Sequence, residues 1–173
     1  MGKHVYLTGF MGAGKSTVGR ALAERLDWPF LDLDDSIEAQ QGMTIAEIFA
    51  SRGEAWFRQL ESAALRSLDD SVAAVVATGG GVLSVPENRE WMRAHGLAVW
   101  LDVSFELVTE RLAATDQETR PLFENESQAR ELFAKRQSQY GDSDLRIEVL
   151  SSHSAAEVAA MIQDTLTEEE CVT

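Results

Sequence analysis

The residues of this chain best suited to chemistry lie close to its N-terminus. The segment Gly9–Thr17, GFMGAGKST, fits the pattern G-x-x-x-x-G-K-S/T of a phosphate-binding loop (P-loop) without a mismatch. Gly12 and Gly14 allow successive backbone N–H groups to turn inward around a phosphate oxygen. Lys15 can reach the outer phosphates, and the Ser16 hydroxyl can ligate Mg²⁺. We therefore predict that the chain binds a nucleoside triphosphate.

Two carboxylates, Asp32 and Asp34, end the next short apolar segment. They stand two residues apart at an expected strand end, which would point both side chains to the same face of a sheet. One could hold Mg²⁺ through its waters, and the other could accept a hydrogen bond from a substrate hydroxyl. The simpler explanation is that these acids cap a helix that begins near Ser36, and we accept it for Asp35 alone.

Three consecutive glycines, Gly79, Gly80 and Gly81, follow an expected buried strand over residues 72–78. A plain turn needs only one or two glycines, whereas such a run permits close approach of the backbone to a ligand. We therefore expect this segment to contact a ligand.

Arginine supplies most of the positive charge and suits carboxylates and phosphates. Arg58 has Glu61 three residues later, which is explained most simply by an ion pair on a solvated helix face. Arg120 lies in a polar segment, where a mobile arginine could close over a transferring phosphate. A charged helix face explains Arg136 equally well, and Tyr140 lies one turn further on the same face.

The elements that must position these residues alternate along the chain. Strands are expected over residues 5–7, 29–33, 72–78, 97–102 and 146–150. Helices are expected after the P-loop and over residues 36–41, 45–51, 54–68, 86–94, 105–113, 128–140 and 155–166. This alternation predicts an α/β fold, a three-layer α/β/α sandwich with a five-stranded parallel sheet. Ligands bind at the carboxyl ends of such strands, so the P-loop, the two aspartates and the glycine run should meet at one edge.

Composition narrows the class of protein. The 173 residues, 45% of them hydrophobic and 25% charged, suit a single globular domain. A net charge of −14 argues against a nucleic-acid-binding surface. Because no apolar segment is long enough to span a membrane and the first strand leaves no room for a signal peptide, we expect a cytoplasmic protein. The single cysteine, Cys171, excludes an internal disulfide, and the three histidines lack metal-ligand spacing.

With these motifs in order, the chain resembles the shikimate kinase family from the P-loop to the last strand. The resemblance rests on GFMGAGKSTVG at 9–19, Asp32 with Asp34, GEAWFR at 53–58 with Glu61, ATGGG at 77–81, RPL at 120–122, and Arg136 with Tyr140. One such match would be weak, but six in the family's order and spacing are specific.

The resemblance implies a P-loop kinase of the nucleoside-monophosphate-kinase-like fold that transfers the γ-phosphoryl group of ATP to the 3-hydroxyl of shikimate. ATP would be bound by Gly12, Ala13, Gly14, Lys15, Ser16, Thr17 and Arg120. Shikimate would be bound by Asp34, Arg58, Gly80 and Arg136, and Mg²⁺ by Ser16 and Asp32. The catalytic residues would be Lys15, Asp34 and Arg120, with Asp34 as the candidate base. Glu61 would fix Arg58 by a salt bridge, and Arg120 would close over both substrates.

The same resemblance implies one kinase domain over residues 1–173, with a substrate-binding helical region at about 34–61 and a lid at about 113–125. We expect a monomer that binds neither nucleic acid nor membrane. One position departs from the family, because Ala113 stands where many members carry an arginine that packs on adenine. Arg111 and His153 are the other candidates for adenine contact.

Two alternatives stay open at this point. A related small-molecule kinase such as a gluconate kinase shares the fold and the P-loop, but gives no reason for paired arginines. A relative that only binds ATP would keep Lys15 without needing Asp34, Arg120 and Arg136 together. A GTPase is excluded, because the chain lacks both the N-K-x-D and the D-x-x-G motifs.

Overall fold

The computed structural model describes residues 4–114 and 126–172, with side chains up to residue 168. Its strands are β1 (His4–Thr8), β2 (Phe30–Asp32), β3 (Ala74–Ala77), β4 (Gly96–Val103) and β5 (Leu145–Val149). They form one sheet in the order β2-β3-β1-β4-β5, and every neighbouring pair is parallel. β1 therefore lies at the centre, between β3 and β4, and carries the P-loop at its carboxyl end.

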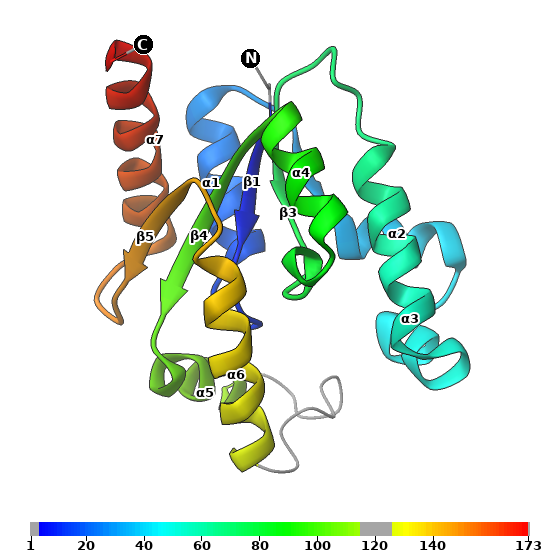
Figure 1. Cartoon of the computed structure of the whole chain (residues 1–173). Coiled ribbons are helices and arrows are strands. Elements are labelled where there is room, and N and C mark those ends of the chain that lie inside the picture. Colours follow the sequence, from blue (N-terminus) through cyan, green and yellow to red (C-terminus); the bar gives the residue numbers. More distant parts are fainter. Residues whose placement is uncertain (1–3, 115–125, 173) are drawn as a thin grey trace.

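Helices connect and cover these strands. They are α1 (Lys15–Leu26), α2 (Leu33–Gln41), α3 (Ile45–Arg66), α4 (Pro86–His95), α5 (Phe105–Ala113), α6 (Glu126–Tyr140) and α7 (Ala155–Val172), with a 3₁₀ turn, η1, over Val82–Ser84. Figure 1 shows α1 and α7 together on one face of the sheet and α4 on the other. The predicted three-layer sandwich with a five-stranded parallel sheet is confirmed. Within the described residues, no helix has both the length and the apolar character needed to cross a membrane.

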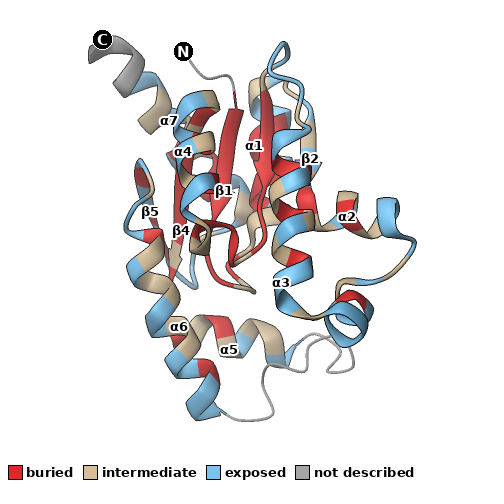
Figure 2. Ribbon diagram, turned by 45° about the vertical axis from the view of Figure 1, so that its right-hand side comes forward, coloured by how far each residue is buried: buried red, intermediate tan, exposed pale blue. Residues whose placement is uncertain are grey.

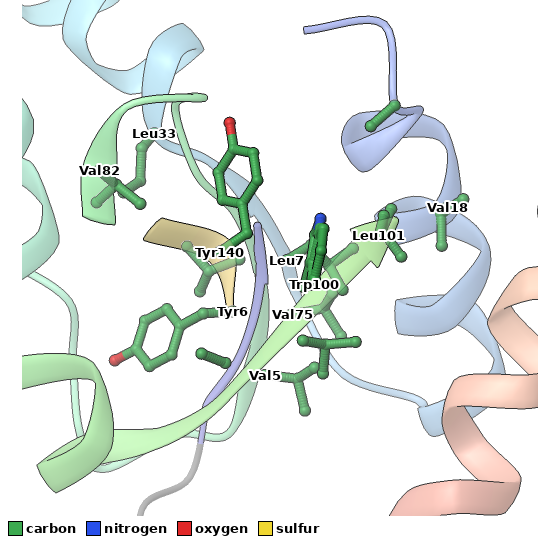
Figure 3. Close-up of a cluster of buried hydrophobic side chains, with 14 of the residues drawn as sticks. Val5, Tyr6, Leu7, Val18, Leu33, Val75, Val82, Trp100, Leu101 and Tyr140 are labelled. Carbon is green, nitrogen blue, oxygen red and sulfur yellow. The ribbon is translucent and has the colours of Figure 1, made fainter. Parts of the chain in front are cut away.

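The sheet is buried on both faces. Every residue of β1 and β3 is buried, as expected for central parallel strands with helices on both sides (Figure 2). Figure 3 shows Val5, Leu7, Val75 and Leu101 packed between the strands and α1 in this core. A rigid sheet thus holds the carboxyl ends of β1 and β3 in fixed register.

The junction of β2 and α2 corrects one prediction. β2 ends at Asp32, and α2 begins at Leu33, so Asp32 and Asp34 do not share one face of a strand. Asp32 is instead the N-cap of α2, and its Oδ1 accepts a hydrogen bond from the Asp34 N–H at 3.1 Å. Asp35, which we expected to cap a helix near Ser36, lies inside the first turn.

α3 joins the two helices expected on either side of Gly53. The Gly53 backbone is not helical, with φ 79°, so the helix changes direction at this residue. Glycine tolerates this left-handed region of φ at little steric cost. The kink separates the N-terminal turns of α3 from the segment that carries Arg58 and Glu61.

Candidate active site

The predicted site residues that the structure describes converge near the carboxyl ends of β1, β2 and β3. Figure 2 shows α3 on one side of these strand ends and α5 and α6 on the other. The segment after β3 touches the segment after β1, because a Cβ added to Gly80 would lie 3.5 Å from the Gly9 oxygen and 3.6 Å from the Met11 nitrogen. The expected meeting of the P-loop with the glycine run at one edge is therefore observed.

The P-loop wraps around the start of α1. Gly12 and Gly14 have φ of 76° and 95°, which side chains other than glycine rarely adopt, and Gly14 is the N-cap of α1. The Lys15 ammonium donates hydrogen bonds to the Gly9 oxygen at 2.8 Å and the Phe10 oxygen at 3.0 Å. The lysine thus lies across its own loop, with its charge beside the N-terminus of α1, where anions bind.

Ser16 and Asp32 face one another beside the P-loop. The Ser16 hydroxyl donates to Asp32 Oδ2 at 2.6 Å. A hydroxyl and a carboxylate are hard oxygen donors of the kind that Mg²⁺ prefers, and Mg²⁺ commonly takes its other ligands from phosphates and water. Within the described residues, no cluster of three or more His, Cys, Asp or Glu side chains could hold a metal by itself. The donor set therefore fits a cation that arrives with a nucleotide.

Asp34 places a buried carboxylate near the P-loop lysine. Its Oδ1 is buried and has no hydrogen-bond partner in the structure. Burial raises the pKa of the Asp34 carboxyl, and the Lys15 ammonium acts in the opposite direction. A partly desolvated carboxylate beside a phosphate loop suits a group that accepts a proton from a hydroxyl.

Arg58 and Glu61 do not form the solvated pair that the simplest reading of their spacing suggested. The Glu61 side chain is 0% exposed and that of Arg58 is 17% exposed, with Nη1 and Oε2 2.7 Å apart. Burial raises the pKa of the Glu61 carboxyl, and the Arg58 guanidinium counteracts this shift. The arginine is therefore held in place by a buried carboxylate that it also neutralises.

Arg136 belongs to the same cluster rather than to a charged helix face. Its side chain is only 11% exposed, and its Nη2 lies 3.8 Å from Glu54 Oε1. The same Glu54 oxygen lies 3.2 Å from Arg58 Nη2, so guanidinium groups from α3 and α6 meet at one carboxylate oxygen. Glu54 was not assigned a role from the sequence. The available signal was the four-residue spacing from Glu54 to Arg58, which is one helical turn.

Each glycine of the run at 79–81 faces a different part of the site. A Cβ on Gly79 would overlap Glu61 Oε1 and lie 3.2 Å from Asp34 Oδ1. A Cβ on Gly81 would overlap the Arg58 guanidinium. The side chains of Glu61 and Arg58 therefore leave no room for a Cβ at Gly79 and Gly81, whether or not a ligand is bound.

Tyr140, one helical turn beyond Arg136 on α6, reaches the glycine run with its hydroxyl. It donates a hydrogen bond to the Gly80 oxygen at 2.6 Å. An aromatic pair also borders the cluster, because Phe57 lies below the Arg58 guanidinium at 5.1 Å and packs on Phe49 with ring centroids 4.8 Å apart. Sequence reasoning assigned neither contact.

The two candidates for adenine contact, Arg111 and His153, contact different segments of the chain. Arg111 Nη1 donates to the Gly12 and Ala13 oxygens at 3.2 and 3.1 Å, so this arginine lies against the P-loop backbone. His153 Nδ1 accepts a hydrogen bond from the Leu150 N–H at 3.2 Å. Ala113 ends α5, and Arg120 lies outside the described residues.

Comparison with known proteins identifies the family. The family model described as shikimate kinase matches residues 11–167. A shikimate kinase of Geobacter sulfurreducens is 47% identical over 150 residues, which is 85% of this chain and 82% of that protein.

Solved structures agree with this match. The shikimate kinase of Acinetobacter baumannii in complex with shikimate superposes with a TM-score of 0.89 at 36% identity, covering 98% of this chain and 95% of that one. The shikimate kinase of Aquifex aeolicus gives a TM-score of 0.84 at 34% identity, covering 96% and 98%. The chain therefore belongs to the shikimate kinase family.

Proposed function

We propose that this chain transfers the γ-phosphoryl group of ATP to the 3-hydroxyl of shikimate and releases ADP and shikimate 3-phosphate. The observation that carries the proposal is the meeting of Arg58 and Arg136 at one carboxylate oxygen. Paired guanidinium groups are suited to hold a carboxylate-bearing substrate. Family membership and the shikimate bound to the Acinetobacter baumannii relative support the same acceptor.

The donor side of the reaction is built on the P-loop. Residues 12–17 would cradle the phosphates of ATP with backbone N–H groups and the N-terminus of α1. Lys15 would leave the carbonyls of its own loop and neutralise charge on the transferring group. Arg120, outside the described residues, would add a second positive charge from the lid at about 113–125.

Ser16 and Asp32 are the residues that would hold Mg²⁺. When bound, Mg²⁺ would neutralise charge on the β- and γ-phosphates. The 2.6 Å hydrogen bond between Ser16 and Asp32 brings both oxygens close enough to serve one cation. Asp32 is further oriented by the N–H of Asp34, so the cap of α2 fixes both carboxylates relative to each other.

The acceptor side requires alignment more than covalent chemistry. Arg58 and Arg136 would hold the shikimate carboxylate, and Gly80 would contact the ring from the backbone. Asp34 would accept the proton of the 3-hydroxyl as the new oxygen–phosphorus bond forms. The bond from the γ-phosphorus to the bridging oxygen breaks in the same step, and ADP leaves. Of these residues, Asp34 and Arg58 belong to the proposed substrate region at about 34–61, whereas Gly80 and Arg136 come from later in the sequence.

We place the whole reaction in one kinase domain, active as a cytoplasmic monomer. Its test is the release of ADP, measured in a coupled assay with Mg²⁺ and ATP in the presence of shikimate, of gluconate, or of neither. We expect ADP release to depend on shikimate. Release with gluconate would assign a different acceptor, and ATP binding without any release would assign a non-catalytic role.

A further inference from the structure

All three carbonyl oxygens of the glycine run at 79–81 accept hydrogen bonds from other groups of the protein. The Gly79 oxygen accepts from the Val82 N–H at 3.2 Å, the Gly80 oxygen from the Tyr140 hydroxyl at 2.6 Å, and the Gly81 oxygen from the Ser84 N–H at 2.9 Å and the Ser84 hydroxyl at 2.6 Å. In the described part of the chain, none of the three glycine N–H groups donates to a protein acceptor. The carbonyl oxygens of the run are therefore satisfied within the protein, and its backbone N–H groups remain available to donate to a ligand.

The bond to Gly80 differs from the others in its origin. Val82 and Ser84 lie three residues from the glycines that they contact, and such local bonds form with η1 itself. Tyr140 is 60 residues away in the sequence. This one hydrogen bond therefore ties the glycine run to α6, the helix that also carries Arg136.

Tyr140 is suited to act as a fixed anchor. Its side chain is 2% exposed and its ring packs near that of Trp100, with centroids 5.9 Å apart (Figure 3). Burial raises the pKa of the Tyr140 hydroxyl, so the group keeps its proton and remains a donor at neutral pH. A buried aromatic ring with few rotamers holds its hydroxyl at low entropic cost.

We propose that Tyr140 is a positioning residue for the acceptor, acting through the peptide between Gly80 and Gly81. A peptide unit is planar and trans, so fixing the Gly80 carbonyl toward α6 points the Gly81 N–H away from α6. Gly81 also lies against the Arg58 guanidinium. Tyr140 thus orients the Gly81 N–H toward the substrate carboxylate that Arg58 and Arg136 would bind. This inference rests on the proposed function.

The test compares Tyr140→Phe with Tyr6→Phe, and the chain has no other tyrosines. Tyr6 is a matched control, since it is 0% exposed and its hydroxyl has no hydrogen-bond partner in the structure. Figure 3 shows the two hydroxyls pointing away from one another. We expect Tyr140→Phe to lower kcat/KM for shikimate about tenfold, mainly by raising its KM, because the Gly80 carbonyl loses its partner.

The other readouts separate positioning from simple packing. The KM for ATP should change by less than about twofold in Tyr140→Phe, and Tyr6→Phe should keep both KM values. A Tyr140→Phe enzyme with a lowered melting temperature and an unchanged KM for shikimate would overturn the inference. The wild-type assay tests a different claim, because absence of shikimate-dependent ADP release would refute the proposed function and not the role of Tyr140.

Discussion

The two ends of β1 both contain buried polar side chains, but they differ in what surrounds those side chains. At the carboxyl end, Asp34 Oδ1 and Glu61 Oε1 lack hydrogen-bond partners, and both face the position of a Cβ on Gly79. At the amino end, the polar atoms without partners belong to rings, those of His4, Tyr6 and Trp91. Glycine backbone thus borders the first set, and aromatic packing encloses the second.

The amino end is filled by ring contacts. His4 and Tyr6 meet edge to face with centroids 5.6 Å apart, and Trp91 stacks on His95 at 3.8 Å. Gly96 also lies at this end, but a Cβ there would overlap the His4 oxygen, so its backbone packs against a strand. The unpartnered polar groups at the amino end thus lie among rings and strand backbone, whereas those at the carboxyl end lie beside the glycine run. Substitutions at the carboxyl end should change kinetics, with or without a change in stability, whereas those at the amino end should change stability alone.

The largest expected effect is that of Lys15→Ala at the carboxyl end. Loss of the Lys15 ammonium should lower kcat by about 10³-fold, because this ammonium stabilises charge on the transferring phosphoryl group. The melting temperature should change little, since the Lys15 ammonium donates to partly buried carbonyls of its own loop. Coupled assays and thermal melts would measure both. Lys135→Ala, an exposed lysine on α6, is the matched control and should keep wild-type kcat.

Arg58→Ala should affect both kinetics and stability. The KM for shikimate should rise about 10²-fold, with a smaller change in the KM for ATP, because a charged contact to the carboxylate is lost. Unfolding free energy should fall by about 3 kcal/mol, since Glu61 would remain buried without its cation.

A second substitution separates these two effects. Adding Glu61→Gln to Arg58→Ala should restore part of the stability without restoring the KM for shikimate. Arg66→Ala on the same helix is the control, because Arg66 donates to the Ser62 oxygen at the exposed surface. Equal changes in the KM values for the two substrates would contradict the assignment of Arg58.

Features encoded by consecutive residues were predictable from the sequence. The P-loop is one such feature, since its glycines, lysine and serine follow one another and its backbone geometry depends on them. The alternation of strands and helices similarly predicted the sheet. The β2–α2 junction was predicted wrongly, because a strand pattern cannot show that Asp32 caps a helix that begins at the next residue.

Features that depend on distant segments were not predictable. The three-residue spacing of Arg58 and Glu61 is the same on a solvated helix face and on a covered one. Burial comes from the glycine run at 79–81, which packs against both side chains. The contact between Tyr140 and Gly80 spans 60 residues, and no local pattern encodes it.

The smallest expected effect is at the amino end of β1 and concerns pH. Burial lowers the pKa of His4 from its ordinary value of 6.5, while Asp70 acts in the opposite direction and His95 adds to the lowering. Below about pH 6.5 the unfolded chain therefore binds a proton that the folded chain resists. The contribution of His4 should lower the melting temperature as the pH decreases from 7.5 to 5.5, and His4→Phe should remove this contribution relative to the wild type.

The same measurement distinguishes two contributions at this end. Asp70 oxygens lie 3.6 Å from His4 Nε2 and 3.4 Å from His95 Nε2, but the Asp70 side chain is 50% exposed, so solvent screens both pairs. If these pairs outweighed burial, His4→Phe would lower the melting temperature at acidic pH relative to the wild type, and Asp70→Asn would do the same. In either case the KM for shikimate of His4→Phe at pH 7.5 should match that of the wild type. A changed KM would mean that the two ends of β1 are coupled rather than independent.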